Sequence, residues 1–106
     1  MRKKIILATV LMVTTYATAA VGPPDSVTAL QKGMPSDVVK LINRIVACNH
    51  WSGEEAYDAE RQRDIEDALR ESRCDQLKRD ETSIRDKYRR NKKVEKALDG
   101  ANELYL

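Results

Sequence analysis

The stretch SDVVKLINRIVAC, residues 36–48, decides the fold of this chain. Its apolar residues recur at spacings of three and four: Val38, Leu41, Ile42, Ile45 and Cys48. This spacing places them on one face of an α-helix. Asp37 stands at the start of that helix, where the helix dipole favours an acidic side chain. We therefore expect a helix here, with this face at the centre of the core.

The chain after this stretch also favours helix. From Asp58 it is rich in Ala, Arg, Glu, Gln, Lys and Leu, and it contains no glycine or proline before Gly100. A drifting apolar stripe fits either one long helix or two helices broken near Ser72. Asn91 is placed to cap a last short helix that Gly100 ends. We see no strand pattern, so we expect an all-α bundle of three or four helices over residues 36–106.

The N-terminus has the three parts of a secretory signal peptide. Basic residues 2–4 precede an apolar run over residues 5–13, and small residues follow at positions 17–20. A run of about nine residues is well short of the roughly 20 that a membrane-spanning helix needs. We expect residues 1–20 to be cleaved, which predicts a periplasmic or secreted product without a transmembrane segment. Residues 21–35 then form a flexible leader, with one helical turn near Val27–Gln31.

The charges change their meaning once the signal peptide is removed. Three of the nineteen basic residues lie within it, whereas all seventeen acidic residues lie beyond it, which leaves a net charge of −1. This balance gives no support for nucleic acid as a partner. Residues 54–75 hold nine acidic and four basic residues, and residues 76–96 hold four and nine. Such separation suits either steering toward a charged partner or packing between oppositely charged helices.

The two cysteines, Cys48 and Cys74, predict a disulfide, because an even number of cysteines in an exported protein usually pairs. Free thiols or metal ligands are the alternatives. Closing the loop of about 26 residues between them would add on the order of 3–4 kcal/mol to the free energy of unfolding. A continuous helix from Asp58 would carry Cys74 about 24 Å away from its start. Either the link before Asp58 runs back along that helix, or the helix breaks before Cys74.

The segment Asn49–Tyr57 reads as a loop and holds the candidate binding residues: His50, Trp51, Glu54, Glu55 and Tyr57. If the disulfide holds this segment against the following helix, Trp51 and Tyr57 anchor it there, and Trp51 can serve as an interface anchor. The alternative for Trp51 is a place in the core. For His50 the alternative is a local hydrogen bond, and for the two glutamates a solvated helix start.

The spacing of the Ser, His, Cys and acidic residues along the sequence gives little support for a catalytic site or a metal site. No Ser-His-Asp or Cys-His arrangement stands out, so we expect a protein that is not an enzyme and has no cofactor. A metal site can be drawn from Cys48, His50 and a carboxylate, but structural zinc normally takes four nitrogen or sulfur ligands. We expect no metal.

The segment from Leu77 to Tyr88 resembles a known family. Leu77, Asp80, Glu81, Ile84 and Tyr88 follow Cys74, and together they are similar to the pattern Leu-x-x-Leu-Asp-x-x-Leu-x-x-x-Tyr of the LprI-type lysozyme-inhibitor N-terminal domain family. Asp80 and Glu81 depart from it, standing where the family has leucine and aspartate. The resemblance covers about 15 residues and implies an exported, helical, disulfide-linked protein, with lysozyme inhibition as a candidate activity.

These observations favour a small, non-enzymatic binding protein of the bacterial periplasm, whose partner is a protein or a cell-envelope component. The first alternative is an inhibitor of a lysozyme-like cell-wall hydrolase, for which an acidic surface would face a basic enzyme. The second alternative is a metal-dependent or stress-response factor that uses His50.

The signal-peptide hypothesis predicts the mass of the exported chain. Protein isolated from a periplasmic fraction should have an intact mass that corresponds to a chain beginning at Ala20 or Val21. Full-length protein recovered from the cytosol would contradict export.

Overall fold

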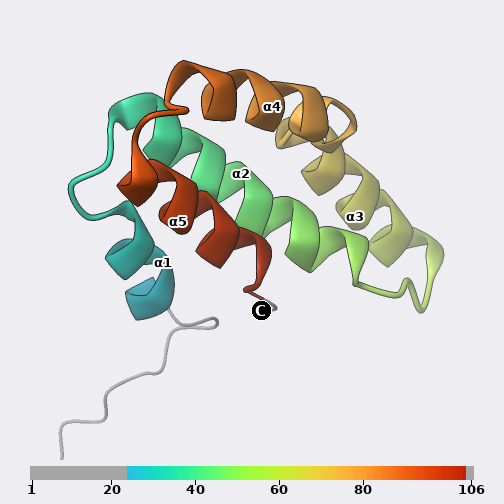
Figure 1. Ribbon diagram of the computed structural model, residues 1–106. Helices are drawn as coiled ribbons and strands as arrows, with labels where there is room; N and C mark the ends of the chain where they lie inside the picture. Colours follow the sequence, from blue (N-terminus) through green and yellow to red (C-terminus); the bar gives the residue numbers. More distant parts are fainter. Residues whose placement is uncertain (1–23, 105–106) are drawn as a thin grey trace, which may run out of the picture.

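The computed structural model describes residues 24–104, which form helices alone (Figure 1). The elements are α1 (Pro24–Gln31), α2 (Ser36–Ser52), α3 (Ala59–Glu71), the 3-10 helix η1 (Cys74–Gln76), α4 (Leu77–Lys87) and α5 (Lys92–Asn102). The predicted all-α class is confirmed for these residues, with five α-helices instead of three or four. Within them, no helix combines the length and the apolar character needed to cross a bilayer. The expected signal peptide, residues 1–20, lies outside the described part.

Helix α2 is the centre of the fold, as its apolar spacing predicts. It packs against α1, α3, α4 and α5, and its whole predicted face is buried: Val38, Leu41, Ile42, Ile45 and Cys48. Val94 and Leu98 of α5 complete the most deeply buried set. Each such aliphatic side chain contributes roughly 1.5–3 kcal/mol through burial. The contact between α2 and α5 therefore supplies most of the core.

Helix α5 begins as predicted but ends later. The side-chain oxygen of Asn91 accepts hydrogen bonds from the backbone N–H groups of Lys93 (3.1 Å) and Val94 (3.2 Å), so the predicted cap is confirmed. Gly100 does not end the helix, which continues to Asn102. A Cβ atom at position 100 would lie 2.6 Å from the Cδ2 atom of Leu30. The glycine therefore serves the close approach of α1.

Helix α1 lies within the segment expected to be a leader. Where the sequence indicated a single turn, residues 24–31 form an eight-residue helix. Val27, Leu30 and Met34 pack against the core. The Gln31 amide donates hydrogen bonds to the Val39 carbonyl (3.1 Å) and to Asn43 Oδ1 (2.7 Å) of α2. These contacts make α1 part of the bundle.

The chain between Asp58 and Tyr88 forms two helices, with the break at Ser72 and Arg73. Arg73 has φ 50°, in the left-handed region that ends a helix. Because α3 stops at Glu71, Cys74 turns back toward α2 and bonds to Cys48, with an S–S distance of 2.06 Å. The predicted disulfide is confirmed. Of the two routes that the sequence allowed, the chain breaks its helix before Cys74.

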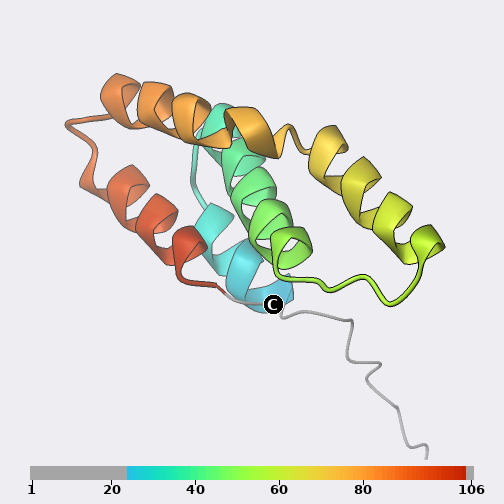
Figure 2. The same cartoon turned by 90° about the vertical axis from the view of Figure 1, so that its right-hand side faces the viewer.

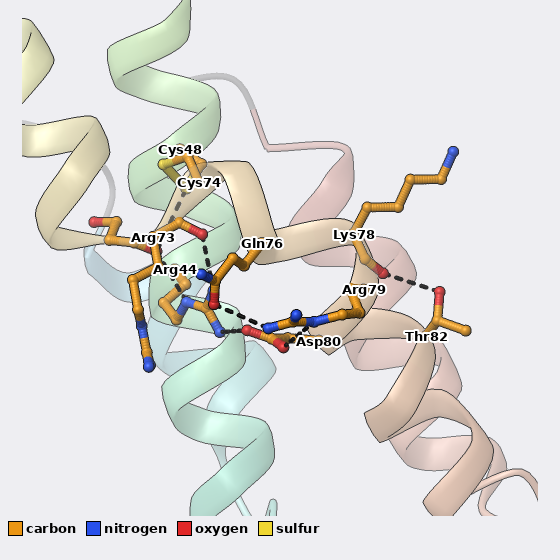
Figure 3. Close-up of polar contacts among 10 residues, drawn as sticks. Arg44, Cys48, Arg73, Cys74, Gln76, Lys78, Arg79, Asp80 and Thr82 are labelled. Atoms are coloured by element: carbon orange, nitrogen blue, oxygen red, sulfur yellow. Dashed lines mark hydrogen bonds and ion pairs between the residues drawn. A yellow bond between two sulfur atoms is a disulfide. The ribbon is translucent and has the colours of Figure 1, made fainter.

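Arg44 of α2 holds the same junction by polar contacts (Figure 3). Its guanidinium donates to the carbonyls of Ser72 (2.9 Å) and Arg73 (3.0 Å), which lie beyond the end of α3. The remaining guanidinium nitrogen lies 2.9 Å from the Asp80 carboxylate of α4. One side chain therefore connects α2 to both helices that follow the break.

Asp37 holds the other end of α4. Its carboxylate accepts hydrogen bonds from the Lys87 ammonium (2.7 Å) and the Tyr88 hydroxyl (2.8 Å). Along α2, Asp37 contacts Tyr88, Arg44 contacts Asp80, and Cys48 bonds to Cys74. The residue numbers therefore rise on α2 as those of the partners fall. Helices α2 and α4 are therefore antiparallel and cross-linked in one register.

Both carboxylates in this register are stabilised in their charged form. The hydrogen bond from Arg44 lowers the pKa of Asp80, and those from Lys87 and then Tyr88 lower the pKa of Asp37. Because the pKa of each carboxyl group is lower in the folded state than in the unfolded state, these contacts stabilise the fold at pH values above the ordinary carboxyl pKa. This stabilisation is lost as the pH falls through the lowered pKa values.

The disulfide predicts a large effect of Cys74→Ser under oxidising conditions. We expect the free energy of unfolding to fall by about 3–4 kcal/mol, because the unfolded chain regains the entropy that the closed loop removes. This corresponds to a melting temperature lower by on the order of 15 °C for a domain of this size. Thermal unfolding followed by circular dichroism measures it, with Ser83→Ala, an exposed position on α4, as the control. Equal melting of Cys74→Ser and wild type would contradict a stabilising bridge.

Candidate functional site

The segment predicted as a loop is in part helical. Helix α2 continues through Ser52, whose hydroxyl donates to the Cys48 carbonyl (2.6 Å), and the Gly53 N–H donates to the His50 carbonyl (3.2 Å). The connecting segment is therefore residues 53–58. His50 and Trp51 lie on the last turn of α2, which fixes their backbone more firmly than a loop would.

Helix α3 starts where the connection ends. Asp58 caps it, because its side chain accepts a hydrogen bond from the Arg61 N–H (2.8 Å). The Arg61 guanidinium lies over the Trp51 indole, at 5.1 Å from the ring centroid. Such a cation–π contact contributes about 0.5–1 kcal/mol at an exposed site. Arg61 was not among the predicted site residues, although its place in the first turn after the Asp58 cap was a usable signal.

Four of these side chains form one connected cluster at the end of α2. Glu54 lies 3.4 Å from His50 Nε2 and 3.3 Å from an Arg61 guanidinium nitrogen. The His50 and Trp51 rings meet edge to face, with centroids 5.1 Å apart. All four are partly exposed. Trp51 lies outside the buried core cluster, so the indole is held on the surface by its neighbours.

The other two predicted residues lie apart from the cluster on the connecting segment. Tyr57 is 81% exposed, and among residues 24–104 it is the one large hydrophobic side chain that is exposed. Glu55 is also exposed. The expectation that Tyr57 anchors the segment to the helix is wrong, because its ring stands in solvent. A tyrosine in this position combines a large apolar ring with a hydroxyl free to meet a partner.

The surroundings of these aromatic residues are acidic. The exposed side chains of α3 and its approach include seven carboxylates: Glu55, Asp58, Glu60, Asp64, Glu66, Asp67 and Glu71. Arg63 and Arg70 are the exposed cations of the same helix, and Arg70 pairs with Asp67 at 3.0 Å. This end of the molecule therefore presents excess negative charge. We call the surface formed by His50, Trp51, Glu54, Glu55 and Tyr57 the α2–α3 end.

The disulfide bears on the metal site drawn from the sequence. Cys48 bonds to Cys74, which removes the thiolate that this site needed. Within residues 24–104, no group of three His, Cys, Asp or Glu side chains is placed to hold a metal ion. His50 instead contacts Trp51 and Glu54.

Comparisons with family models, with curated proteins and with solved structures each found no match to this chain.

Proposed function

We propose that this chain is a small exported binding protein, without enzymatic activity, that recognises a protein or another cell-envelope component through the α2–α3 end. The observation that carries the proposal is Tyr57, an 81% exposed aromatic residue on the segment that follows Trp51. Tyrosine and tryptophan supply much of the binding energy in protein interfaces.

The arrangement of the neighbouring side chains supports this role. His50 and Arg61 contact the Trp51 indole, and Glu54 contacts both of them. An aromatic residue held in place before binding loses little conformational entropy on binding. Tyr57 differs, because it extends from a segment outside the helices. The α2–α3 end thus combines one held aromatic ring with one exposed ring.

The charge around the rings indicates the chemistry of the partner. The exposed carboxylates of α3 favour a partner with positive charge at the contact. They also disfavour nucleic acid and anionic polysaccharide, which repel such a surface.

The alternative of a lysozyme-type inhibitor rests on the same acidic surface. A basic cell-wall hydrolase is one partner that meets the charge requirement, and the segment Leu77–Tyr88 resembles an inhibitor family. In this alternative, the acidic side chains that face the enzyme are Glu54, Glu55, Asp58 and Glu60. An assay of lysozyme activity on bacterial cell walls, with and without this protein, separates a specific inhibitor from a binding protein with another target.

The proposal predicts that Trp51→Ala and Tyr57→Ala remove binding and leave the fold intact. Tyr57 is exposed, so its replacement should change the free energy of unfolding by less than about 0.5 kcal/mol. Trp51 is outside the core, so its replacement should cost less than the roughly 3–5 kcal/mol typical of a core tryptophan. The measurement is capture of proteins from periplasmic extract on each immobilised variant, identified by mass spectrometry.

Glu103→Ala, an exposed position at the end of α5, is the matched control and should retain the same proteins as wild type. Binding should fall at least tenfold for the two aromatic variants. An unchanged set of captured proteins would contradict the proposal. Unfolding of Trp51→Ala together with undiminished capture by Tyr57→Ala would assign the tryptophan a structural role and also contradict it.

A further inference from the structure

A second charged surface lies at the turn between α4 and α5, and its charge is positive. Arg90, Lys92, Lys93 and Lys96 are all exposed, and Glu95 is the acidic residue among them. On α5, position 96 follows positions 93 and 92 by three and four residues, so these lysines share one side of the helix. We call these four cations the basic corner.

The cations of the basic corner are not neutralised by the fold. Elsewhere the arginines that hold the bundle face carboxylates, as Arg44 does with Asp80 and Arg85 with Glu81 and Asp99. Next to the corner, Lys87 pairs with Asp37 and Arg89 with Asp86. None of the four cations of the corner forms an ion pair with a carboxylate of residues 24–104. Their charge is therefore available to an outside partner.

The position of the basic corner also matters. Figure 2 shows the α4–α5 turn at one extremity of the molecule, and the start of α3 at the opposite side. The acidic surface of α3 is therefore remote from a partner that touches the turn. The corner projects from the bundle, so it can meet a broad, flat surface without the rest of the molecule interfering.

We propose that the basic corner is a docking site for an anionic phospholipid surface. Basic side chains near such a surface each add to the attraction, and salt screens it. A chain with a net charge near zero is not drawn to a membrane as a whole, so the attraction depends on this local cluster. The site is separate from the α2–α3 end and leaves that surface facing away from the lipid.

The neighbouring side chains favour lipid over nucleic acid. Binding of single strands normally uses aromatic side chains on which bases stack. The aromatic residue beside the corner is Tyr88, which is partly buried and donates its hydroxyl hydrogen to Asp37. The side-chain oxygen of Asn91, which could otherwise read a base edge, accepts the capping hydrogen bonds of α5. What remains is a group of long, mobile cations, suited to diffuse phosphate charge.

The test is co-sedimentation of the exported, disulfide-bonded protein with phosphatidylcholine vesicles that contain phosphatidylglycerol. Wild type should bind them, should release them at high ionic strength, and should ignore vesicles of phosphatidylcholine alone. Lys92→Gln with Lys93→Gln should weaken binding roughly tenfold to thirtyfold. The control is Arg63→Gln with Lys78→Gln, which removes the same charge from exposed positions on α3 and at the start of α4. It should leave binding within about twofold, because position is what matters.

Circular dichroism should show the same unfolding for both double variants, since all four side chains are exposed. Equal weakening by both pairs would overturn the proposal, because binding would then follow total charge. Wild type that does not sediment with the anionic vesicles would also overturn it. So would tighter binding to a single-stranded oligonucleotide than to vesicles of equal phosphate content.

Discussion

The antiparallel contact between α2 and α4 is the constraint on which the rest of the structure depends. Helix α4 has no fully buried side chain, and α3 has one, Ile65. Leu77 and Ile84 of α4 pack against the core, but both are only partly buried, so burial contributes less here than between α2 and α5. These two helices are also held by the Cys48–Cys74 bond, by Arg44, and by the pairing of Asp37 with Lys87 and Tyr88. Cross-links therefore contribute a larger share of the stability in α3 and α4 than in the hydrophobic core formed by α2 and α5.

This division bears on both proposed surfaces. The α2–α3 end exists because the chain leaves α2 at Gly53 and returns along α3 to the fixed point at Cys74. The basic corner forms because α4 is fixed to α2 through Asp80 and Lys87, so the turn into α5 lies at the opposite side of the molecule. Acidic and basic residues are thereby separated in space as they are in sequence, while Arg44–Asp80 and Lys87–Asp37 are ion pairs between α2 and α4.

The sequence predicted the features that depend on neighbouring residues. The buried face of α2 followed from its apolar spacing, and Asn91 was recognised as a cap from its place before an amphipathic stretch. The disulfide followed from cysteine parity in a chain that we expect to be exported.

Contacts between distant segments were missed, since Gly100 faces Leu30 and Arg44 faces Ser72, and no local pattern marks either pair. One signal was available: Asp37 and Arg44 are seven residues apart, as are Asp80 and Lys87, with the order of charge that an antiparallel pair needs. At the candidate site, the residues were recognised by type, but the helical state of His50 and Trp51 depends on where α2 ends.

Hydrogen exchange of Arg44→Gln, read helix by helix with the disulfide intact, tests the central role of the cross-linked register most directly. Arg44 donates to the carbonyls of Ser72 and Arg73 and pairs with Asp80, so its loss should release α3 and α4 locally. Amide exchange should be at least tenfold faster in α3 and in the first turns of α4, while α2 and α5 should stay nearly as protected as in wild type. Acceleration by the same factor in all helices, or in none, would contradict the central role of the register.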